Sequence, residues 1–368
     1  MKILIITNHS YILYRFRREL IASLQKDHEV VLGMPFVGHE DDFQAMNLKC
    51  INIDMDRRGI NPMNDLRLMS VYWNLLRVEH PDMVITYSIK PNIYAGFMCG
   101  IMGIPFFANV QGLGTAFQRK GLAEFVTTLY RLALKKAKAV FFENEGNAKI
   151  FIDRKILKKD KITILPGAGI NLERFPLTPY PQNDQVHFLY LCRIMKEKGI
   201  DELFAAMRRL HHELGNKVIL DLVGFFDDDY EAEVKRLVED GIAVFHGFQT
   251  DTIPYYVAAD CVVLPSYHEG LSNVLLEAAA IGRPVITSDI HGCKETVDNG
   301  ISGLLCQVKD ADDLYKQMSK MVNLNCSQRE EMGIAARQKV EQQFEKNMVV
   351  QKTIDVIFQN NNTYNKVR

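Results

Sequence analysis

The residues best suited to chemistry lie in two polar segments, each directly after an apolar run. In the first segment Arg193 and Lys198 flank a turn, and Gly199 beside them allows a close backbone approach. An arginine fork and a lysine point charge at one turn can hold a diphosphate between them. The alternative is a solvated charged loop, which is the usual state of a Lys-Glu-Lys-Gly stretch.

The second segment, 264–278, carries two carboxylates on either side of an expected helix start near Ser272. Free N–H groups at a helix start, together with the helix dipole, suit a phosphate. Glu269 precedes the helix and Glu277 lies about a turn and a half inside it, so the two can contact different parts of one ligand. Spacing alone equally allows Glu269 to be a capping group and Glu277 a solvated helix residue.

Short apolar runs that alternate with helical periodicity must position these segments. Such runs indicate parallel sheets covered on both faces, and a chain of 368 residues favours two such domains. The fold class is therefore α/β, with two doubly wound Rossmann-like domains in series. We expect strands at 3–7, 29–32, 83–87, 106–110, 139–143 and 162–165 in the first domain, and at 188–192, 218–223, 244–248, 261–265, 284–287 and 303–306 in the second.

A segment with three prolines and no periodicity, 175–184, indicates the linker between the domains. We place the first domain at 1–176 and the second at 177–345. The helix of 346–368 is expected to return to the first domain and to end in a frayed tail. Ligands of open α/β sheets bind beyond the carboxyl ends of the strands, so two facing domains would hold a ligand in a central cleft.

The composition is that of a soluble globular protein, with 47% hydrophobic and 24% charged residues. Seven scattered cysteines without a CxxC pair favour reduced thiols in the cytoplasm and argue against a zinc site. We expect no signal peptide and no membrane span. Up to Tyr180 the sequence holds 24 Lys and Arg against 17 Asp and Glu, and after Tyr180 it holds 20 Lys and Arg against 28 Asp and Glu. This difference implies different partners for the two halves.

Taken together, these residues resemble the family 4 glycosyltransferases. The pattern is carried by Arg193, Lys198-Gly199 and the Glu269–Glu277 spacing, and further matching segments follow in order along the chain. The resemblance implies a retaining enzyme of the GT-B architecture that uses a nucleotide-sugar donor, with no metal and no cofactor. The supporting segments are 165–175, 221–224, 245–248, 282–286 and 300–303.

The resemblance assigns a role to each matching residue of the second domain. Arg193 and Lys198 would bind the donor diphosphate and neutralise charge on the leaving group. Glu277 would bind the ribose hydroxyls, and Glu269 would lie against the transferred sugar. Backbone N–H groups of Gly270, Leu271, Ser272 and Asn273 would cradle the phosphates, and Gly224 and Phe248 would border the nucleotide.

A narrower resemblance links segments 109–117 and 288–297 to bacterial capsule, O-antigen and glycan-assembly transferases. Those enzymes act on polyprenyl-diphosphate-linked sugars and often use UDP-hexosamines. Three positions depart from common family patterns. The first expected strand is followed by Thr7-Asn8-His9-Ser10, where many relatives have two glycines. Gln111-Gly112 stands where many relatives have a loop with a histidine, and Cys192 stands where a glycine often precedes the arginine.

The first domain would bind the acceptor. Lys90 follows an expected strand where Pro91 begins a helix, and His9 and Gln111 also follow strands, although His9 is equally suited to a structural role. Gly112 and Arg15 complete the predicted acceptor-binding residues. The basic residues Arg15, Arg17, Arg18, Arg119, Lys120, Arg131, Lys135, Lys136 and Lys138 suit the anionic inner face of a cell membrane or form solvated helix faces.

We expect no nucleic-acid partner, because no nucleic-acid-binding motif is present and the second half is acidic. The run of three aspartates, Asp227–Asp229, is expected to be a solvated turn and not a metal site.

The leading interpretation is a transferase that moves a hexose or N-acetylhexosamine from a UDP-sugar to a polyprenyl-diphosphate-linked saccharide. One alternative is a GT-B-fold UDP-N-acetylglucosamine 2-epimerase, which would need acid and base groups placed for proton abstraction. A second alternative is a non-catalytic protein that binds nucleotide sugars without turnover.

Overall fold

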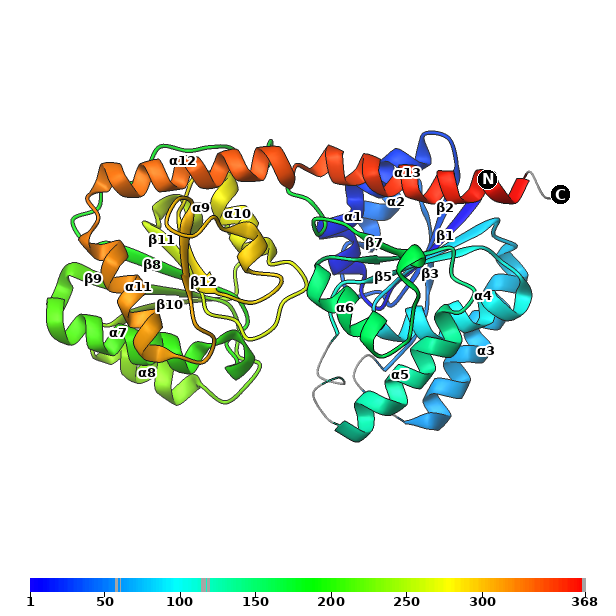
Figure 1. The fold of residues 1–368 in the computed structure, drawn as a ribbon, viewed down its shortest axis with the longest axis horizontal. Helices are drawn as coiled ribbons and strands as arrows, with labels where there is room; N and C mark the ends of the chain where they lie inside the picture. The colour runs from blue at the N-terminus through cyan, green and yellow to red at the C-terminus, as the bar shows by residue number, and fades with distance from the viewer. Residues whose placement is uncertain (57–58, 60, 114–116, 118–119, 366–368) are drawn as a thin grey trace. The chain divides into compact units, whose positions relative to one another are not determined.

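The computed structural model describes residues 1–56, 59, 61–113, 117 and 120–365. The chain divides into two compact units (Figure 1). Unit 1 comprises Met1–Gly169 and Lys346–Arg368, and unit 2 comprises Ile170–Glu345. The division falls earlier than residue 176, where we predicted it, because Phe175 packs in the core of unit 2 and the Ile170 N–H donates to the Phe344 carbonyl at 2.8 Å.

Unit 1 is built on a seven-stranded parallel sheet of order β3-β2-β1-β4-β5-β6-β7. Alternate residues of β1 face opposite sides of this sheet, since Ile3 and Ile5 pack with α1, α2 and α13 whereas Leu4 and Ile6 pack with the layer of α3, α4, α5 and α6. The strands are β1 Lys2–Ile6, β2 Glu29–Met34, β3 Lys49–Asn52, β4 Met83–Tyr87, β5 Phe106–Val110, β6 Ala139–Phe142 and β7 Ile162–Ile164. The helices are α1 Ser10–Gln25, α2 Glu40–Ala45, α3 Pro62–Glu79, a π-helical turn at Pro91–Ala95, α4 Gly96–Met102, α5 Lys120–Leu134, α6 Glu145–Asp153 and α13 Lys346–Asn365.

Unit 2 contains a six-stranded parallel sheet of order β10-β9-β8-β11-β12-β13. Helices α9, α10 and α12 cover one face of this sheet, and α7, α8 and α11 cover the other (Figure 1). Its strands are β8 Val186–Leu191, β9 Val218–Val223, β10 Ala243–Gly247, β11 Cys261–Leu264, β12 Val285–Ser288 and β13 Gly303–Cys306. Its helices are α7 Ile200–Leu214, α8 Glu231–Glu239, α9 Ile253–Ala258, α10 Asn273–Ile281, α11 Ala311–Asn323 and α12 Cys326–Gln343.

The strand order reverses once in each sheet. In such sheets the crevice lies beyond the carboxyl ends of the two strands that flank the reversal. These strands are β1 and β4 in unit 1, and β8 and β11 in unit 2. The loops after β8 and β11 are the two polar segments that the sequence singled out.

Candidate functional site

The loops after β8 and β11 are packed directly against each other. Gly199 has a positive φ of 72°, and a Cβ on it would lie 2.0 Å from the Pro265 carbonyl oxygen, so only glycine fits. The Tyr267 N–H donates to the Glu197 carbonyl at 2.9 Å, which ties the second loop to the first. The close approach brings the cationic turn and the carboxylate-bearing loop into one site.

Lys198 and Glu269 form a partly buried ion pair within this site. The Nζ–Oε1 distance is 2.6 Å, and the side chains are 13% and 14% exposed. Burial of the ammonium works against its charge, but the attraction of Glu269 outweighs burial and raises the pKa of Lys198 above its ordinary value. The ion pair therefore favours the charged form of Lys198, and the interpretation of this turn as a solvated loop is wrong for Lys198.

Arg193 is held by a carboxylate from the loop after β9. Its Nη1 donates to Asp227 Oδ2 at 2.5 Å. The backbone N–H of Asp227 donates to the Ile194 carbonyl at 3.0 Å, and the N–H of Lys196 donates to Asp228 Oδ2 at 2.9 Å. The prediction that Asp227–Asp229 form a solvated turn is thus wrong for Asp227, which is 16% exposed and anchors the cationic loop.

Glu277 lies in α10 and is 2% exposed, so it is no solvated helix residue. Its Oε2 accepts a hydrogen bond from the Tyr256 hydroxyl at 2.9 Å. The sequence offered no signal for this partner, because Tyr256 belongs to α9, a helix that no motif marks.

The predicted phosphate cradle, Gly270 to Asn273, lies at the start of α10, and one of its N–H groups is already bonded within the protein. Ser272 is the N-cap residue, but its side chain makes no capping hydrogen bond in α10. The Ser272 N–H donates to the Gly292 carbonyl at 2.9 Å, so this N–H is engaged within the protein. Leu271 and Ser272 are buried, and Gly270 and Asn273 are partly exposed beside Glu269. The N–H groups at the first turn of α10, from Asn273 onward, face the same end of the helix.

The loops after β9 and β10 lie on the other side of β8 and are joined through glycine. The Gly224 N–H donates to the Gly247 carbonyl at 2.9 Å, and a Cβ on Gly224 would lie 1.9 Å from the Cys192 carbonyl oxygen. Phe248 follows β10, is 56% exposed and contacts the exposed ring of Phe225 at 6.0 Å between centroids. Gly224 and Phe248 therefore lie at the strand ends where the prediction placed the nucleotide.

In unit 1, three predicted acceptor residues follow three neighbouring strands. His9 follows β1, Lys90 follows β4 and Gln111 follows β5. Ser88 Oγ donates to Asn8 Oδ1 at 2.7 Å, which joins the loops at the strand reversal. Lys90 is 13% exposed and forms an ion pair with Asp65 at 2.8 Å, so its charge is already partly compensated.

The other predicted acceptor residues are less tightly defined by the structure. Arg15 is on α1, where its Nη1 donates to the Tyr11 hydroxyl at 3.4 Å. Gly112 is partly exposed, and a Cβ there would meet no atom within 4 Å, so packing does not require glycine. Residues 114–116 of the predicted 109–117 segment and Arg119 lie outside the described residues, as does the side chain of Lys120.

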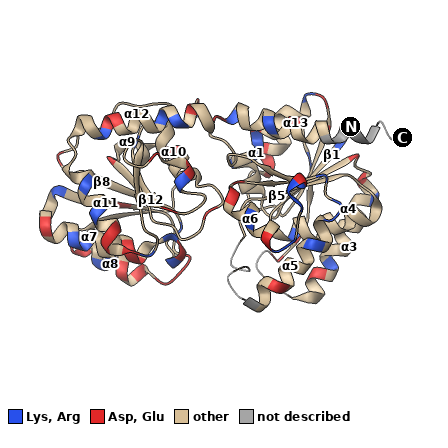
Figure 2. Ribbon diagram, viewed as in Figure 1, with Lys and Arg blue, Asp and Glu red and all other residues tan. Residues whose placement is uncertain are grey.

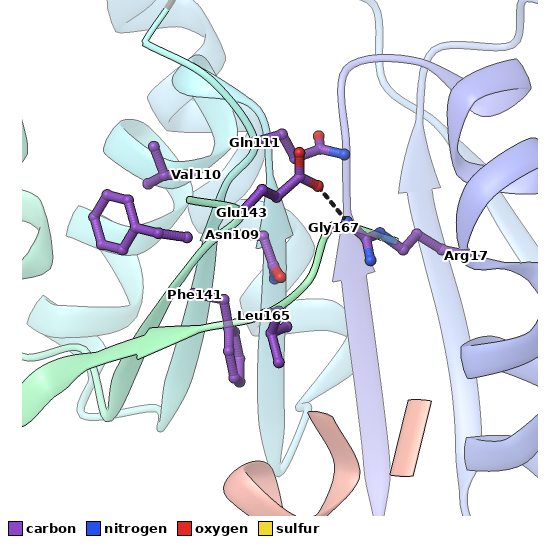
Figure 3. A pocket seen from close by; sticks show the side chains of 9 residues that line it. Arg17, Asn109, Val110, Gln111, Phe141, Glu143, Leu165 and Gly167 are labelled. Atoms are coloured by element: carbon purple, nitrogen blue, oxygen red, sulfur yellow. Dashed lines mark hydrogen bonds and ion pairs between the residues drawn. The ribbon is translucent and has the colours of Figure 1, made fainter. Parts of the chain in front are cut away.

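Arg17 lines a small hollow in unit 1 and does not lie on the outer surface where it was predicted (Figure 3). Arg17, Gln111 and Glu143 line this hollow, which has a volume of about 170 Å³ when the open solvent in its mouth is counted. Arg17 is 6% exposed, forms a 2.9 Å ion pair with Glu143 and lies over the ring of Tyr87. The prediction that Arg17 belongs to a basic outer surface is therefore wrong, because this side chain points inward from α1.

Comparison with known proteins shows that each unit matches a glycosyltransferase family model. The family model described as glycosyl transferase 4-like matches residues 2–144, and the model of glycosyl transferases group 1 matches residues 185–323. The chain is 28% identical over 329 residues to N,N'-diacetylbacillosaminyl-diphospho-undecaprenol alpha-1,3-N-acetylgalactosaminyltransferase of Campylobacter jejuni, covering 84% of this chain and 86% of that protein. It is 29% identical to the capsular polysaccharide biosynthesis glycosyltransferase CapM of Staphylococcus aureus, covering 80% of each chain.

The fold agrees with solved structures. Anabaena HepE in complex with UDP superposes with a TM-score of 0.78 at 16% identity, covering 98% of this chain and all of that one. The fold and the loops at its strand reversals therefore define a glycosyltransferase of the GT-B fold. More narrowly, the chain belongs to the family 4 glycosyltransferases, because its two halves match the two family models in order. The predicted family and fold class are confirmed.

Proposed function

We propose that the protein transfers a hexose or N-acetylhexosamine from a UDP-sugar to a polyprenyl-diphosphate-linked saccharide in bacterial surface glycan assembly. The observation that carries this proposal is the joint placement of Arg193, Lys198, Glu269 and Glu277 at the strand reversal of unit 2. Of the two relatives described above, one is named for a diphospho-undecaprenol-linked acceptor and the other for capsular polysaccharide biosynthesis.

The reaction we propose proceeds with retention and without a metal. Arg193 and Lys198 neutralise the departing diphosphate, which is the role a divalent cation would otherwise fill. Glu269 and the phosphate cradle come from one short loop, so the Glu269 carboxylate does not reach the sugar from the face opposite the leaving group. The acceptor hydroxyl then attacks from the leaving-group face, a diphosphate oxygen takes its proton, and Glu269 stabilises positive charge at the anomeric carbon.

Product stereochemistry and chelation test this scheme. Transfer from an α-linked UDP-sugar should give an α-linked product by NMR, and turnover should survive EDTA. A β-linked product would refute retention, and loss of activity on chelation with rescue by magnesium would refute the metal-free scheme. Among the described residues, no group of three His, Cys, Asp or Glu side chains is placed to hold a metal ion.

The two other interpretations predict different outcomes with the same donor. An epimerase would convert UDP-N-acetylglucosamine without any acceptor, and a sensor would bind the donor with no turnover. A thermal-shift panel of UDP-, GDP- and ADP-sugars identifies the donor first, because a ligand that binds only the folded state raises its stability. Each donor that binds is then incubated with and without a polyprenyl-diphosphate-linked saccharide.

We further propose that the protein contacts the anionic inner face of the membrane peripherally, where a polyprenyl-linked acceptor lies. No helix in the described part of the chain is long and apolar enough to span a bilayer. The outer face of α5 fits a surface contact, because Phe125 and Leu132 are 60% and 57% exposed and lie two helical turns apart on one stripe. Lys135 and Lys136 follow this stripe and supply the positive charge that anionic lipids attract.

A further inference from the structure

We propose that Tyr256 is a positioning residue for the donor: its hydroxyl holds the Glu277 carboxylate in the orientation that binds the ribose of the nucleotide. The proposal rests on the proposed function, since it takes Glu277 as a donor-binding residue. It adds a residue from α9, which the sequence motifs leave unassigned.

The contact itself is short and shielded from water. The Tyr256 hydroxyl donates to Glu277 Oε2 at 2.9 Å, and the two residues are 0% and 2% exposed. A buried carboxylate without a compensating donor is costly, and a hydrogen bond to a charged group is stronger than one between neutral groups. Because the two carboxylate oxygens offer several acceptor positions, a bond at Oε2 leaves the group able to accept from ribose hydroxyls as well.

The backbone that carries Tyr256 is itself fixed. Arg283 is fully buried, and its Nε donates to the Tyr256 carbonyl at 3.1 Å while Nη2 donates to the Val257 carbonyl at 2.9 Å. These carbonyls lie near the end of α9, where a guanidinium also complements the helix dipole. The ring of Tyr256 packs edge-on against Phe175 with 6.5 Å between centroids. The hydroxyl therefore has a defined position from which to orient Glu277.

A purely structural hydrogen bond would leave ligand binding unchanged once the protein is folded, and this difference makes the proposal testable. Tyr256→Phe removes one oxygen and keeps the ring. We expect it to weaken UDP binding by about 5- to 10-fold in calorimetric titrations, and to raise KM for the UDP-sugar with little change in kcat. Binding of 2′,3′-dideoxyuridine diphosphate, which lacks both ribose hydroxyls, should be the same in Tyr256→Phe and the wild type.

Three further variants complete the design. Glu277→Gln should also lose affinity for UDP but not for the dideoxy nucleotide. The double variant, Tyr256→Phe with Glu277→Gln, should bind UDP no more weakly than Glu277→Gln alone. Tyr180→Phe is the matched control, because it removes another buried hydroxyl of unit 2, one that donates to the Asp260 carbonyl at 2.6 Å. We expect this control to bind both nucleotides as the wild type does.

The outcomes distinguish failure of the Tyr256 proposal from failure of the proposed function. If Tyr256→Phe binds UDP as tightly as the wild type, or loses affinity for both nucleotides equally, Tyr256 does not act through Glu277 and the proposal fails while the function stands. If Glu277→Gln retains full UDP affinity, the role of Glu277 itself is wrong. If the wild-type protein binds no UDP, the proposed function fails first.

Discussion

Each cation of the proposed donor site is paired with a carboxylate on a neighbouring loop. Lys198 meets Glu269 and Arg193 meets Asp227, so both positive groups are oriented before any ligand arrives. Orientation in advance lowers the cost of binding, because the side chains lose less freedom when the diphosphate enters. The same pairing keeps the partly buried lysine charged.

The two cations should therefore matter far more than a nearby lysine of the same loop. Lys198→Gln or Arg193→Gln is expected to lower kcat/KM by about 10²-fold or more, through loss of charge stabilisation on the leaving diphosphate. Lys196→Gln is the control, since that side chain is 69% exposed and lies 3.7 Å from Asp201. Steady-state kinetics with a saturating acceptor measure the effect, and near-normal activity in both test variants would remove the clamp from the mechanism.

Arg17 and Arg18 are neighbours in sequence with opposite environments, so they make a matched pair for stability. Arg17→Met removes the 2.9 Å ion pair between two largely buried side chains, Arg17 and Glu143, and should destabilise unit 1 by about 3 kcal/mol. Arg18 is 34% exposed and pairs with Glu19 at 3.2 Å, so Arg18→Met should cost less than about 1 kcal/mol. Urea unfolding gives both values, and equal losses of stability in the two variants would contradict the inward placement of Arg17.

At the scale of elements, three strands of unit 2 share one polar cluster. Asp221 of β9 accepts from His187 of β8 at 2.8 Å and from His246 of β10 at 2.7 Å, and the His187 backbone N–H donates to Asp260. The hydrogen bond to Asp221 raises the pKa of His187. Burial alone would raise the pKa of Asp221, but the bonds from both histidines lower it. This cluster joins the strands that carry the nucleotide-bordering loops.

The cluster should make the stability of unit 2 depend on pH in a defined direction. A histidine whose pKa is raised on folding stabilises fully below its unfolded value near 6.5 and loses this contribution as the pH rises through the folded value. The stability difference between the wild type and His187→Gln should thus be larger at pH 6 than at pH 9 in thermal melts. His212→Gln, an exposed histidine on α7, should show no such trend, and a constant difference for His187→Gln would contradict the assignment.

The elements were largely predictable from sequence because their signals are local. Apolar runs marked twelve strands that the structure contains, with ends shifted by a residue or two. β3 was missed because Lys49–Asn52 is an edge strand, short and partly exposed, without an apolar run. Contacts between distant segments were not predictable in this way. Arg17 with Glu143 and Tyr256 with Glu277 depend on how helices pack, which no spacing along the chain records.

For the whole molecule, the charge imbalance between the two halves of the sequence is a weak guide to where a charged partner binds. Lys and Arg are interspersed with Asp and Glu over both units (Figure 2). Two basic residues of the first half are engaged in largely buried ion pairs of unit 1, Arg17 with Glu143 and Lys90 with Asp65. A membrane contact must therefore be argued from side chains that are exposed, and the outer face of α5 provides both apolar and basic ones.

Vesicle binding tests this surface in the complete protein. Phe125→Ser with Leu132→Ser removes two apolar side chains that burial in the interface would stabilise, so co-sedimentation with anionic vesicles should fall by about tenfold or more. Lys135→Gln with Lys136→Gln should weaken binding by about 1 kcal/mol per charge near the surface, an effect that shrinks as salt is added. Ile334→Ser is the control, because Ile334 is exposed on α12 of unit 2 and is 41% accessible. If the α5 variants and the control sediment alike, α5 is a solvated helix face. In either case the variants should keep wild-type turnover of the donor with a short, water-soluble acceptor, because α5 carries none of the proposed donor-site residues.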